Sequence, residues 1–268
     1  MMMRILVTGG TGSLGREFVP IALNAGCQVR IMSRRARPDG ISPQVEWAQA
    51  DLKSGAGLKE AVSGVEVVLH AATSPFFQTG KTDVHGTSLL LEHARSAGVK
   101  NFIYPSIVGI DNIPFSYYRH KLVAESIVRE GGVPWSILRI TQFHSLLDGF
   151  LQSASRFPLM LLPTDFKFQS VDAREAASRL FQCVAAGPSG RLPDFGGPEV
   201  HFLGELARVW IEVCRLRRRV IHIPLPGKAA KAFRRGENTV PEHSDGKTTW
   251  REWLQQRCAR TQNSKPKT

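Results

Sequence analysis

The chain has 268 residues, of which 42% are hydrophobic and 22% are charged, and its formal net charge is +12. These proportions are typical of a globular protein with one large domain, or with one domain and a smaller appendage. No run approaches the roughly 18 apolar residues of a membrane helix, and the first residues are not typical of a secretory signal, so we expect a cytoplasmic protein without a membrane span.

Short β-rich runs alternate with amphipathic stretches through the first 140 residues. This pattern predicts strands at residues 4–9, 28–33, 45–52, 65–72, 100–106 and 134–141. Helical spacing of apolar residues predicts helices at residues 14–26, 58–64, 82–98 and 116–130. Strands separated so regularly by helices indicate right-handed crossovers and a parallel sheet covered on both faces. The expected fold class is therefore α/β, a Rossmann-type doubly wound parallel sheet.

The pattern becomes less regular after Thr141. Strands are predicted at residues 166–171 and 219–226, and helices at residues 172–187, 204–216 and 248–259. We expect three parts: an NAD(P)-binding Rossmann core, a smaller α/β substrate-side region packed on it, and a disordered tail, at residues 1–145, 146–260 and 261–268. Ligands of doubly wound folds bind outside the carboxyl ends of the strands, so the smaller region would close over that crevice.

The C-terminal quarter is strongly basic, because residues 205–268 carry a net charge of +9. Such a segment is typical of a solvated face or of one that attracts an anionic partner. It has no interleaved aromatic repeats and no nucleic-acid module, so no specific nucleic-acid binding is expected. The four cysteines lie far apart, as in a reduced chain, and the histidines form no metal pattern, so no metal site is expected.

The glycine-rich turn after the first strand is the strongest functional signal. Its pattern, Gly-x-Gly-x-x-Gly, follows a strand and opens a helix, which is the setting of a dinucleotide site. A P-loop is excluded, since Arg16 and Glu17 stand where Lys and Ser or Thr are needed. We expect backbone N–H groups here to approach a pyrophosphate. The residues are Gly9, Gly10, Thr11, Gly12, Ser13, Leu14 and Gly15.

The end of the second strand bears on cofactor choice. An NAD site usually has an acidic residue there, but this chain has Ser33, Arg34 and Arg35, with no acid before Asp39. Guanidinium groups suit a 2′-phosphate, which favours NADP(H) over NAD(H), although a solvated basic turn would leave the choice open. After the third strand, Asp51–Leu52 sits where an adenine could be contacted, or where a short helix is capped.

Several segments together resemble a known family. They are TGGTGSLG, ADL, VLHAAT, DVHGTSLLLEHARSAGVKNFIYPS and YYRHKLVAE, and they span most of residues 4–145. These resemble the atypical short-chain dehydrogenases/reductases of the NmrA-like, NAD(P)H-binding kind. The resemblance also implies that Ala71, Ala72 and Thr73, after the fourth strand, border the cofactor.

The resemblance assigns a catalytic Tyr-x-x-x-Lys motif to Tyr117 and Lys121, with Ser106 at the end of the fifth strand. Tyr117 would give a proton, Lys121 would lower the pKa of the phenol and reach the nicotinamide ribose, and Ser106 would bind the substrate carbonyl. The same Tyr and Lys also suit an ordinary exposed helix. One departure is Asp83, which stands where many extended members have Asn.

The substrate residues are less constrained by sequence. Phe76 and Phe77, after the fourth strand, are candidates for an apolar pocket wall, or for a loop packed on the core. Gln142, Phe143 and His144 follow the sixth strand, where such folds often contact substrate, and His144 also suits a structural role.

Three functions remain open. The leading hypothesis is an NADP(H)-dependent oxidoreductase that reduces a carbonyl or quinone-like small molecule, with Tyr117 as the proton donor. The second is a non-catalytic NADP(H)-binding redox sensor or assembly protein. The third is a nucleotide-sugar epimerase, which usually holds NAD tightly and is therefore disfavoured by the arginines after the second strand.

Overall fold

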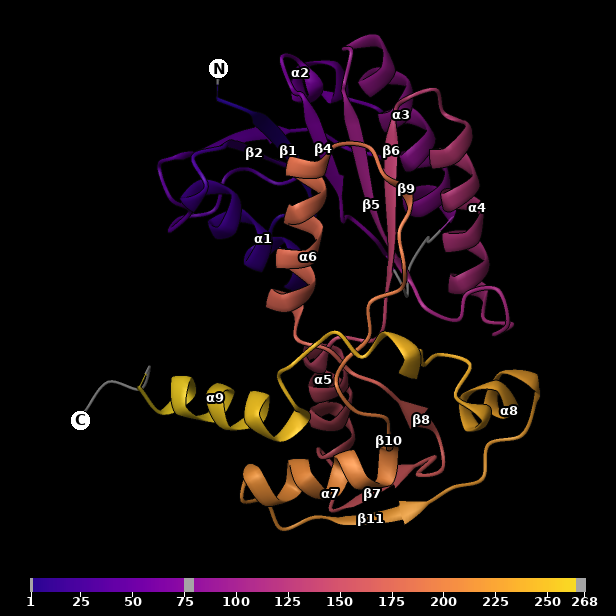
Figure 1. The fold of residues 1–268 in the computed structure, drawn as a ribbon. Helices are drawn as coiled ribbons and strands as arrows, with labels where there is room; N and C mark the ends of the chain where they lie inside the picture. The colour runs from indigo at the N-terminus through magenta and orange to yellow at the C-terminus, as the bar shows by residue number, and fades with distance from the viewer. Residues whose placement is uncertain (1, 75–79, 264–268) are drawn as a thin grey trace.

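A computed structural model describes residues 2–74 and 80–263. Within these ranges, seven strands form one parallel sheet in the order β3-β2-β1-β4-β5-β6-β9 (Figure 1). Their bounds are Arg4–Thr8 (β1), Gln28–Ser33 (β2), Val45–Gln49 (β3), Val67–His70 (β4), Asn101–Ile107 (β5), Trp135–Ile140 (β6) and Gly190–Arg191 (β9). The order reverses between β1 and β4, which is the switch point where doubly wound folds bind ligands. The expected fold class is confirmed.

Helices cover both faces of this sheet (Figure 1). One face carries α1 (Ser13–Asn24) and α6 (Ala173–Ala186), and the other carries α2 (Leu58–Val62), α3 (Gly86–Ser96) and α4 (Ser116–Glu130). A π-helical turn, η1 (Gly80–His85), precedes α3, where the sequence predicted one continuous helix.

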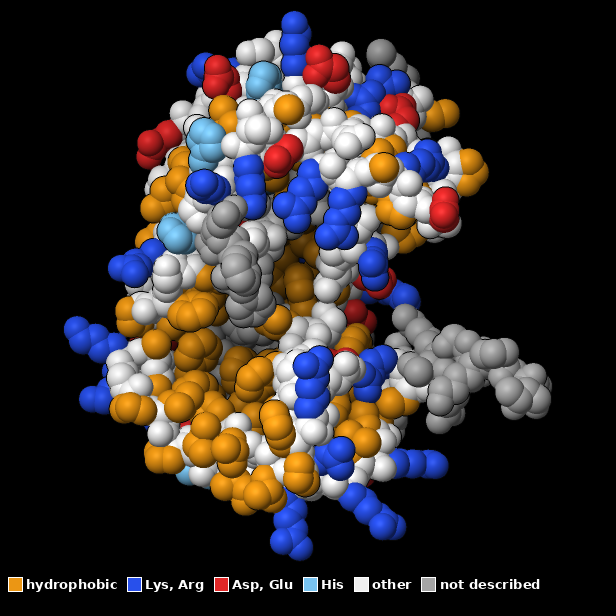
Figure 2. Space-filling model, turned by 180° about the vertical axis from the view of Figure 1, so that it is seen from behind, with side chains coloured by type: hydrophobic (Ala, Val, Ile, Leu, Met, Phe, Trp, Pro, Cys, Tyr) orange, Lys and Arg blue, Asp and Glu red, His pale blue; other side chains and the backbone are white. Residues whose placement is uncertain are grey.

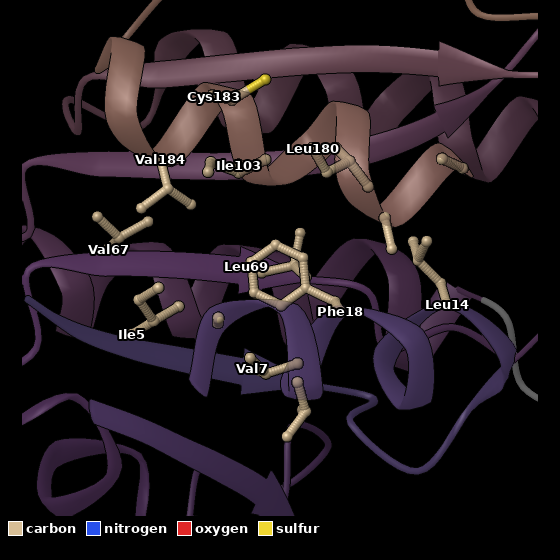
Figure 3. Close-up of a cluster of buried hydrophobic side chains, with 14 of the residues drawn as sticks. Ile5, Val7, Leu14, Phe18, Val67, Leu69, Ile103, Leu180, Cys183 and Val184 are labelled. Carbon is tan, nitrogen blue, oxygen red and sulfur yellow. The ribbon is translucent and has the colours of Figure 1, made fainter. Parts of the chain in front are cut away.

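The core beneath α1 and α6 shows why these segments pair with the sheet. Phe18 of α1, Leu69 of β4 and Leu180 of α6 are all fully buried and face one another (Figure 3). Burying one such side chain contributes about 1.5–3 kcal/mol. Helix α6 comes late in the chain and still packs on α1, so a C-terminal segment returns to cover the N-terminal sheet.

A smaller part lies beyond the carboxyl ends of the strands (Figure 1). Its helices are α5 (His144–Ala154), α7 (Leu203–Val213), α8 (Lys228–Arg235) and α9 (Trp250–Asn263), with a 3-10 turn η2 (Pro241–His243). Its strands form two pairs: β8 (Lys167–Phe168) with β10 (His201–Phe202), antiparallel, and β7 (Leu159–Leu162) with β11 (Arg219–His222), parallel. Seen from behind, the molecule is hollowed between the two parts (Figure 2).

Buried tryptophans hold the smaller part together. Trp210 of α7 is 2% exposed and donates to Asp148 of α5 at 2.7 Å, and Trp250 of α9 donates to the Leu206 carbonyl at 3.0 Å. The predicted strand at residues 219–226 ends at His222, because Pro224 and Pro226 cannot donate to a ladder. In the ranges that the structure describes, no helix combines the length and apolar character needed to cross a bilayer.

Candidate cofactor and catalytic site

The glycine turn after β1 is compressed against the segment that follows β4. Gly9 has a φ of +69°, and a Cβ at this residue would lie 2.8 Å from the backbone of Ala71 and Ala72. A Cβ on Gly15 would lie 2.4 Å from the Gly9 carbonyl oxygen. The Gly12 N–H closes the turn by donating to that carbonyl at 2.9 Å. Only glycine fits at these points, and the backbone is therefore open to close approach by a ligand.

Helix α1 begins in a form suited to an anion. Its N-cap is Gly12, which offers no side-chain cap, and the first turn holds no acidic residue. The N–H groups of Ser13, Leu14 and Gly15 therefore lie at the positive end of the helix with no capping group competing for them. Thr11 and Ser13 are exposed at this end, whereas the side chain of Leu14 is in the core. This arrangement fits a pyrophosphate held by backbone N–H groups.

The arginine turn after β2 is held by its backbone. Trp47 donates to the Arg35 carbonyl at 3.0 Å, and the Arg35 N–H donates to Ser33 Oγ at 3.1 Å. Arg34 and Arg35 are exposed, and their guanidinium groups have no hydrogen-bond partner in the part of the chain that the structure describes. Arg37 differs, because its guanidinium donates to three nearby backbone carbonyls. The guanidinium groups of Arg34 and Arg35 are therefore available to bind a phosphate at the end of β2.

Asp51 and Leu52 follow β3 at the same edge of the sheet. Asp51 Oδ1 accepts from the Lys53 N–H at 3.0 Å, and so closes a local turn. Leu52 is 7% exposed and lies beneath Gly86, whose added Cβ would come within 2.8 Å of Leu52 Cβ. Both residues shape this edge, and their contact with an adenine stays a prediction.

His70, at the end of β4, is locked in a buried chain of hydrogen bonds. The Ala72 N–H donates to Thr8 Oγ1 at 3.1 Å, and the Thr87 hydroxyl donates to the Asp83 carbonyl at 2.6 Å. His70 lies between these hydroxyls, 2.7 Å from Thr8 Oγ1 through Nδ1 and 3.0 Å from Thr87 Oγ1 through Nε2. The Thr87 proton is already used, so Nε2 must donate to Thr87, and Thr8 must donate to Nδ1. Burial lowers the pKa of this neutral imidazole to about 3.

Tyr117, at the start of α4, is joined to a buried carboxylate. The Thr73 hydroxyl donates to Asp83 Oδ1 at 2.5 Å, and its oxygen lies 2.9 Å from the Tyr117 hydroxyl, which must therefore be the donor between these two. Asp83 is 1% exposed and also accepts from the Ser74 N–H at 3.1 Å. Sequence reasoning noted Asp83 only as a departure from the family. Nothing local in the sequence indicates that it meets a residue on α4.

The electrostatics of Tyr117 and Lys121 are set mainly by burial. Burial raises the pKa of the Tyr117 phenol above its ordinary value, and the charge of Asp83 raises it further. Burial lowers the pKa of Lys121 to about 8, against the opposing effect of Asp83. The Lys121 ammonium donates to the Pro105 carbonyl at 3.1 Å and lies 4.0 Å from the centre of the Tyr104 ring. Its expected effect on the phenol stays a prediction.

Ser106 lies on the face of β5 that is turned toward α4. Tyr104, two residues earlier on the same strand face, lies under Lys121 and marks that face. Ser106 is 4% exposed, and its Oγ has no hydrogen-bond partner among the described residues. Buried hydroxyls are nearly always partnered, so an unpaired one beside the Tyr–Lys helix fits an oxygen supplied by a ligand.

The predicted substrate residues fall in different surroundings. Phe76 and Phe77 lie outside the described residues. Gln142 is 8% exposed, with its Oε1 3.3 Å from Asn238 Nδ2, and Phe143 packs on the core beneath the sheet.

His144 is tied to the C-terminal segment. It is 1% exposed, its Nε2 donates to the Thr248 carbonyl at 3.0 Å, and its Nδ1 lies 2.9 Å from Ser170 Oγ. The rings of Trp250 and Trp253 flank it at 5.6 and 5.7 Å. These contacts tie the start of α5 to α9 and to the segment before it. Substrate roles for residues 142–144 stay predictions.

Comparison with known proteins shows which family the chain matches. A family model described as NAD(P)H-binding matches residues 9–151. The chain is 32% identical over 157 residues to the photosystem II assembly factor Ycf39 of Cyanophora paradoxa, covering 55% of this chain and 48% of that protein. It thus spans about half the length of that relative.

Other similarities are to enzymes. The chain is 30% identical over 202 residues to a (4-alkanoyl-5-oxo-2,5-dihydrofuran-3-yl)methyl phosphate reductase of Streptomyces griseus, covering 73% of this chain and 68% of that protein. Its fold is similar to that of an NADPH-dependent quinone oxidoreductase of Escherichia coli, with a TM-score of 0.77, 19% identity, and coverage of 95% and 99%. The chain therefore belongs to the NAD(P)H-binding family of atypical short-chain dehydrogenases/reductases.

Proposed function

We propose that this protein is an NADP(H)-dependent oxidoreductase that reduces a carbonyl or quinone-like small molecule. The observation that carries the proposal is the buried hydroxyl of Ser106, which has no hydrogen-bond partner among the described residues and lies on the strand face turned toward α4, the helix of Tyr117 and Lys121. A hydroxyl in this position can donate to the oxygen of a carbonyl group and hold it beside the phenol.

The side chains have separate tasks in this reaction. A bound nicotinamide would supply the hydride. Ser106 orients the substrate oxygen. The Tyr117 hydroxyl turns from Thr73 to that oxygen and transfers its phenolic proton to it as the new C–H bond forms. The raised pKa of Tyr117 keeps the phenol protonated at neutral pH, which is the form needed to give a proton. Lys121, with a pKa of about 8, remains mostly charged at pH 7 and stabilises the phenolate left behind.

The choice of NADP(H) over NAD(H) rests on Arg34 and Arg35. Both guanidiniums are exposed at the end of β2, with no acidic residue in the turn to accept from a ribose 2′-hydroxyl. Paired charge-assisted hydrogen bonds from arginine suit a phosphate. The same feature disfavours a nucleotide-sugar epimerase, which usually retains NAD.

A non-catalytic NADP(H)-binding assembly protein is the second candidate. Two observations favour it: the similarity to an assembly factor, and the engagement of the Lys121 ammonium by the Pro105 carbonyl. In that case the Tyr–Lys pair is structural, and cofactor binding occurs without turnover.

One assay separates these candidates. The purified protein is mixed with NADPH and a panel of quinones and aldehydes, and NADPH oxidation is followed for the wild type, Tyr117→Phe and Tyr118→Phe. Tyr118 is the matched control, because it is the adjacent phenol on α4 and belongs to the apolar cluster on which Tyr117 also packs. The reductase proposal predicts turnover that Tyr117→Phe abolishes and Tyr118→Phe retains. Turnover that survives in Tyr117→Phe removes that residue from its role, and tight NADPH binding with no turnover supports the assembly protein.

A further inference from the structure

The outer face of the β7–β11 pair is apolar and exposed. Leu159 and Leu161 of β7 are 50% and 57% exposed, and the intervening Met160 is fully buried, so the strand turns alternate side chains to solvent. Ile221 of β11 lies opposite Leu161 in the register and is 42% exposed. Phe157, just before β7, is 69% exposed. We call Phe157, Leu159, Leu161 and Ile221 the apolar face.

This face is more than a scatter of single apolar residues. Leu146 and Phe150, one turn apart on α5, are 52% and 46% exposed, and α5 packs against β7. Figure 2 shows apolar side chains gathered over much of the smaller part of the molecule. Isolated exposed leucines are normal in a soluble protein, but a gathered apolar field usually marks an interaction surface.

Cations border the apolar face. Between Glu212 and Glu237 the sequence has eight Lys or Arg and no Asp or Glu. Arg219 lies opposite Leu159 in the strand register and, like Arg217, is exposed. Neither forms an ion pair within the described part of the chain. In Figure 2, Lys and Arg side chains project along the lower margin of the gathered apolar side chains, where few acidic side chains are visible.

We propose that the apolar face and its arginines seat the protein on the surface of an anionic lipid bilayer. Exposed aliphatic and aromatic side chains would enter the boundary between headgroups and acyl chains, and Arg217 and Arg219 would contact lipid phosphates. A second copy of the chain fits this surface poorly, because a self-contact would bring clusters of like charge together. An acidic lipid surface satisfies both the apolar and the cationic parts of the face.

The test is sedimentation of the full-length protein with vesicles. One set is phosphatidylcholine alone, and the other is phosphatidylcholine with a quarter phosphatidylglycerol. The variants are Arg217→Gln/Arg219→Gln and Leu161→Ser. The matched controls are Arg129→Gln and Val123→Ser, which change an exposed cation and an exposed apolar residue on α4. Far-UV circular dichroism and NADPH affinity, which should not change, report the integrity of each variant.

The proposal predicts binding to the anionic vesicles, weak binding to phosphatidylcholine alone, and release by salt. Each removed arginine should weaken binding about fivefold, Leu161→Ser should also weaken it, and both controls should bind as the wild type does. Absence of binding to anionic vesicles, or undiminished binding by the variants, would overturn it. Concentration-dependent dimerisation that Leu161→Ser abolishes would overturn it in favour of a second copy. Binding to an acidic protein in place of the vesicles would overturn it in favour of a protein partner.

Discussion

Replacement of His70 by Asn should make the free energy of unfolding fall less steeply as the pH drops below 6. The folded-state pKa of His70 is about 3, against about 6.5 for an unperturbed histidine. His70 therefore binds a proton near pH 6.5 in the unfolded chain, but only near pH 3 in the folded chain. Its contribution to the free energy of unfolding is complete above pH 6.5 and is lost as the pH falls toward 3.

The magnitude follows from the pKa difference. Each pKa unit corresponds to about 1.4 kcal/mol, so the full difference is of the order of 5 kcal/mol, with a slope near 1.4 kcal/mol per pH unit in the middle of the range. Urea unfolding between pH 7 and pH 4 measures this slope as the decline in the free energy of unfolding. His70→Asn should be less stable than the wild type at pH 7, because it loses hydrogen bonds, but should decline less steeply below pH 6.

The matched control is His85→Asn, which replaces an exposed histidine on η1. It should keep the wild-type slope. Equal slopes for the wild type and His70→Asn would refute the inference that His70 is buried and neutral between Thr8 and Thr87.

Three further predictions concern the cofactor turn and helix α4. Gly9→Ala should weaken NADPH binding at least tenfold in calorimetry, because its Cβ meets backbone at 2.8 Å, whereas Gly26→Ala, with open space around it, should leave binding unchanged. Glu125→Gln should lower the free energy of urea unfolding by about 1–3 kcal/mol, because it removes the buried carboxylate that Arg139 contacts twice at 2.8 Å and leaves Arg139 with Asp111 as its charged partner. An unchanged midpoint would contradict this. Asp83→Asn removes a charge that raises the pKa of Lys121, which is about 8, so the alkaline limb of the reductase pH–rate profile should move to lower pH. An unmoved limb would exclude this coupling.

The first half of the fold was predictable because its local signals agree. Strands such as β1 and β4 are short, buried apolar runs, and helices such as α1 and α3 end near a glycine, at Gly26 and Gly98. The shorter elements have too few residues for a strand or helix periodicity to be recognised. Strand β9 has two residues, Gly190–Arg191, and exists only because it adds to the edge of β6. Helix α5 was missed as well, since its N-cap, Phe143, offers no side-chain cap.

The parts of the site that consist of residues close together in the sequence were predictable. The glycine turn and the order of Ser106, Tyr117 and Lys121 could be read along the chain. The hydrogen bonds from Tyr117 through Thr73 to Asp83 could not, because Thr73 and Tyr117 are 44 residues apart and meet only when the end of β4 lies beside α4. The raised pKa of Tyr117 could not be predicted from the sequence either, because burial in the folded protein is its main cause.

The glycine turn and the arginine turn should together bind a phosphorylated dinucleotide. Titration calorimetry of the wild type and of Arg34→Ala/Arg35→Ala with NADPH and NADH measures this binding. The wild type should prefer NADPH, and the double variant should lose about tenfold or more in NADPH affinity while its NADH affinity stays unchanged. No measurable association of NADPH with the wild type at millimolar concentration would rule out a dinucleotide site at these two turns.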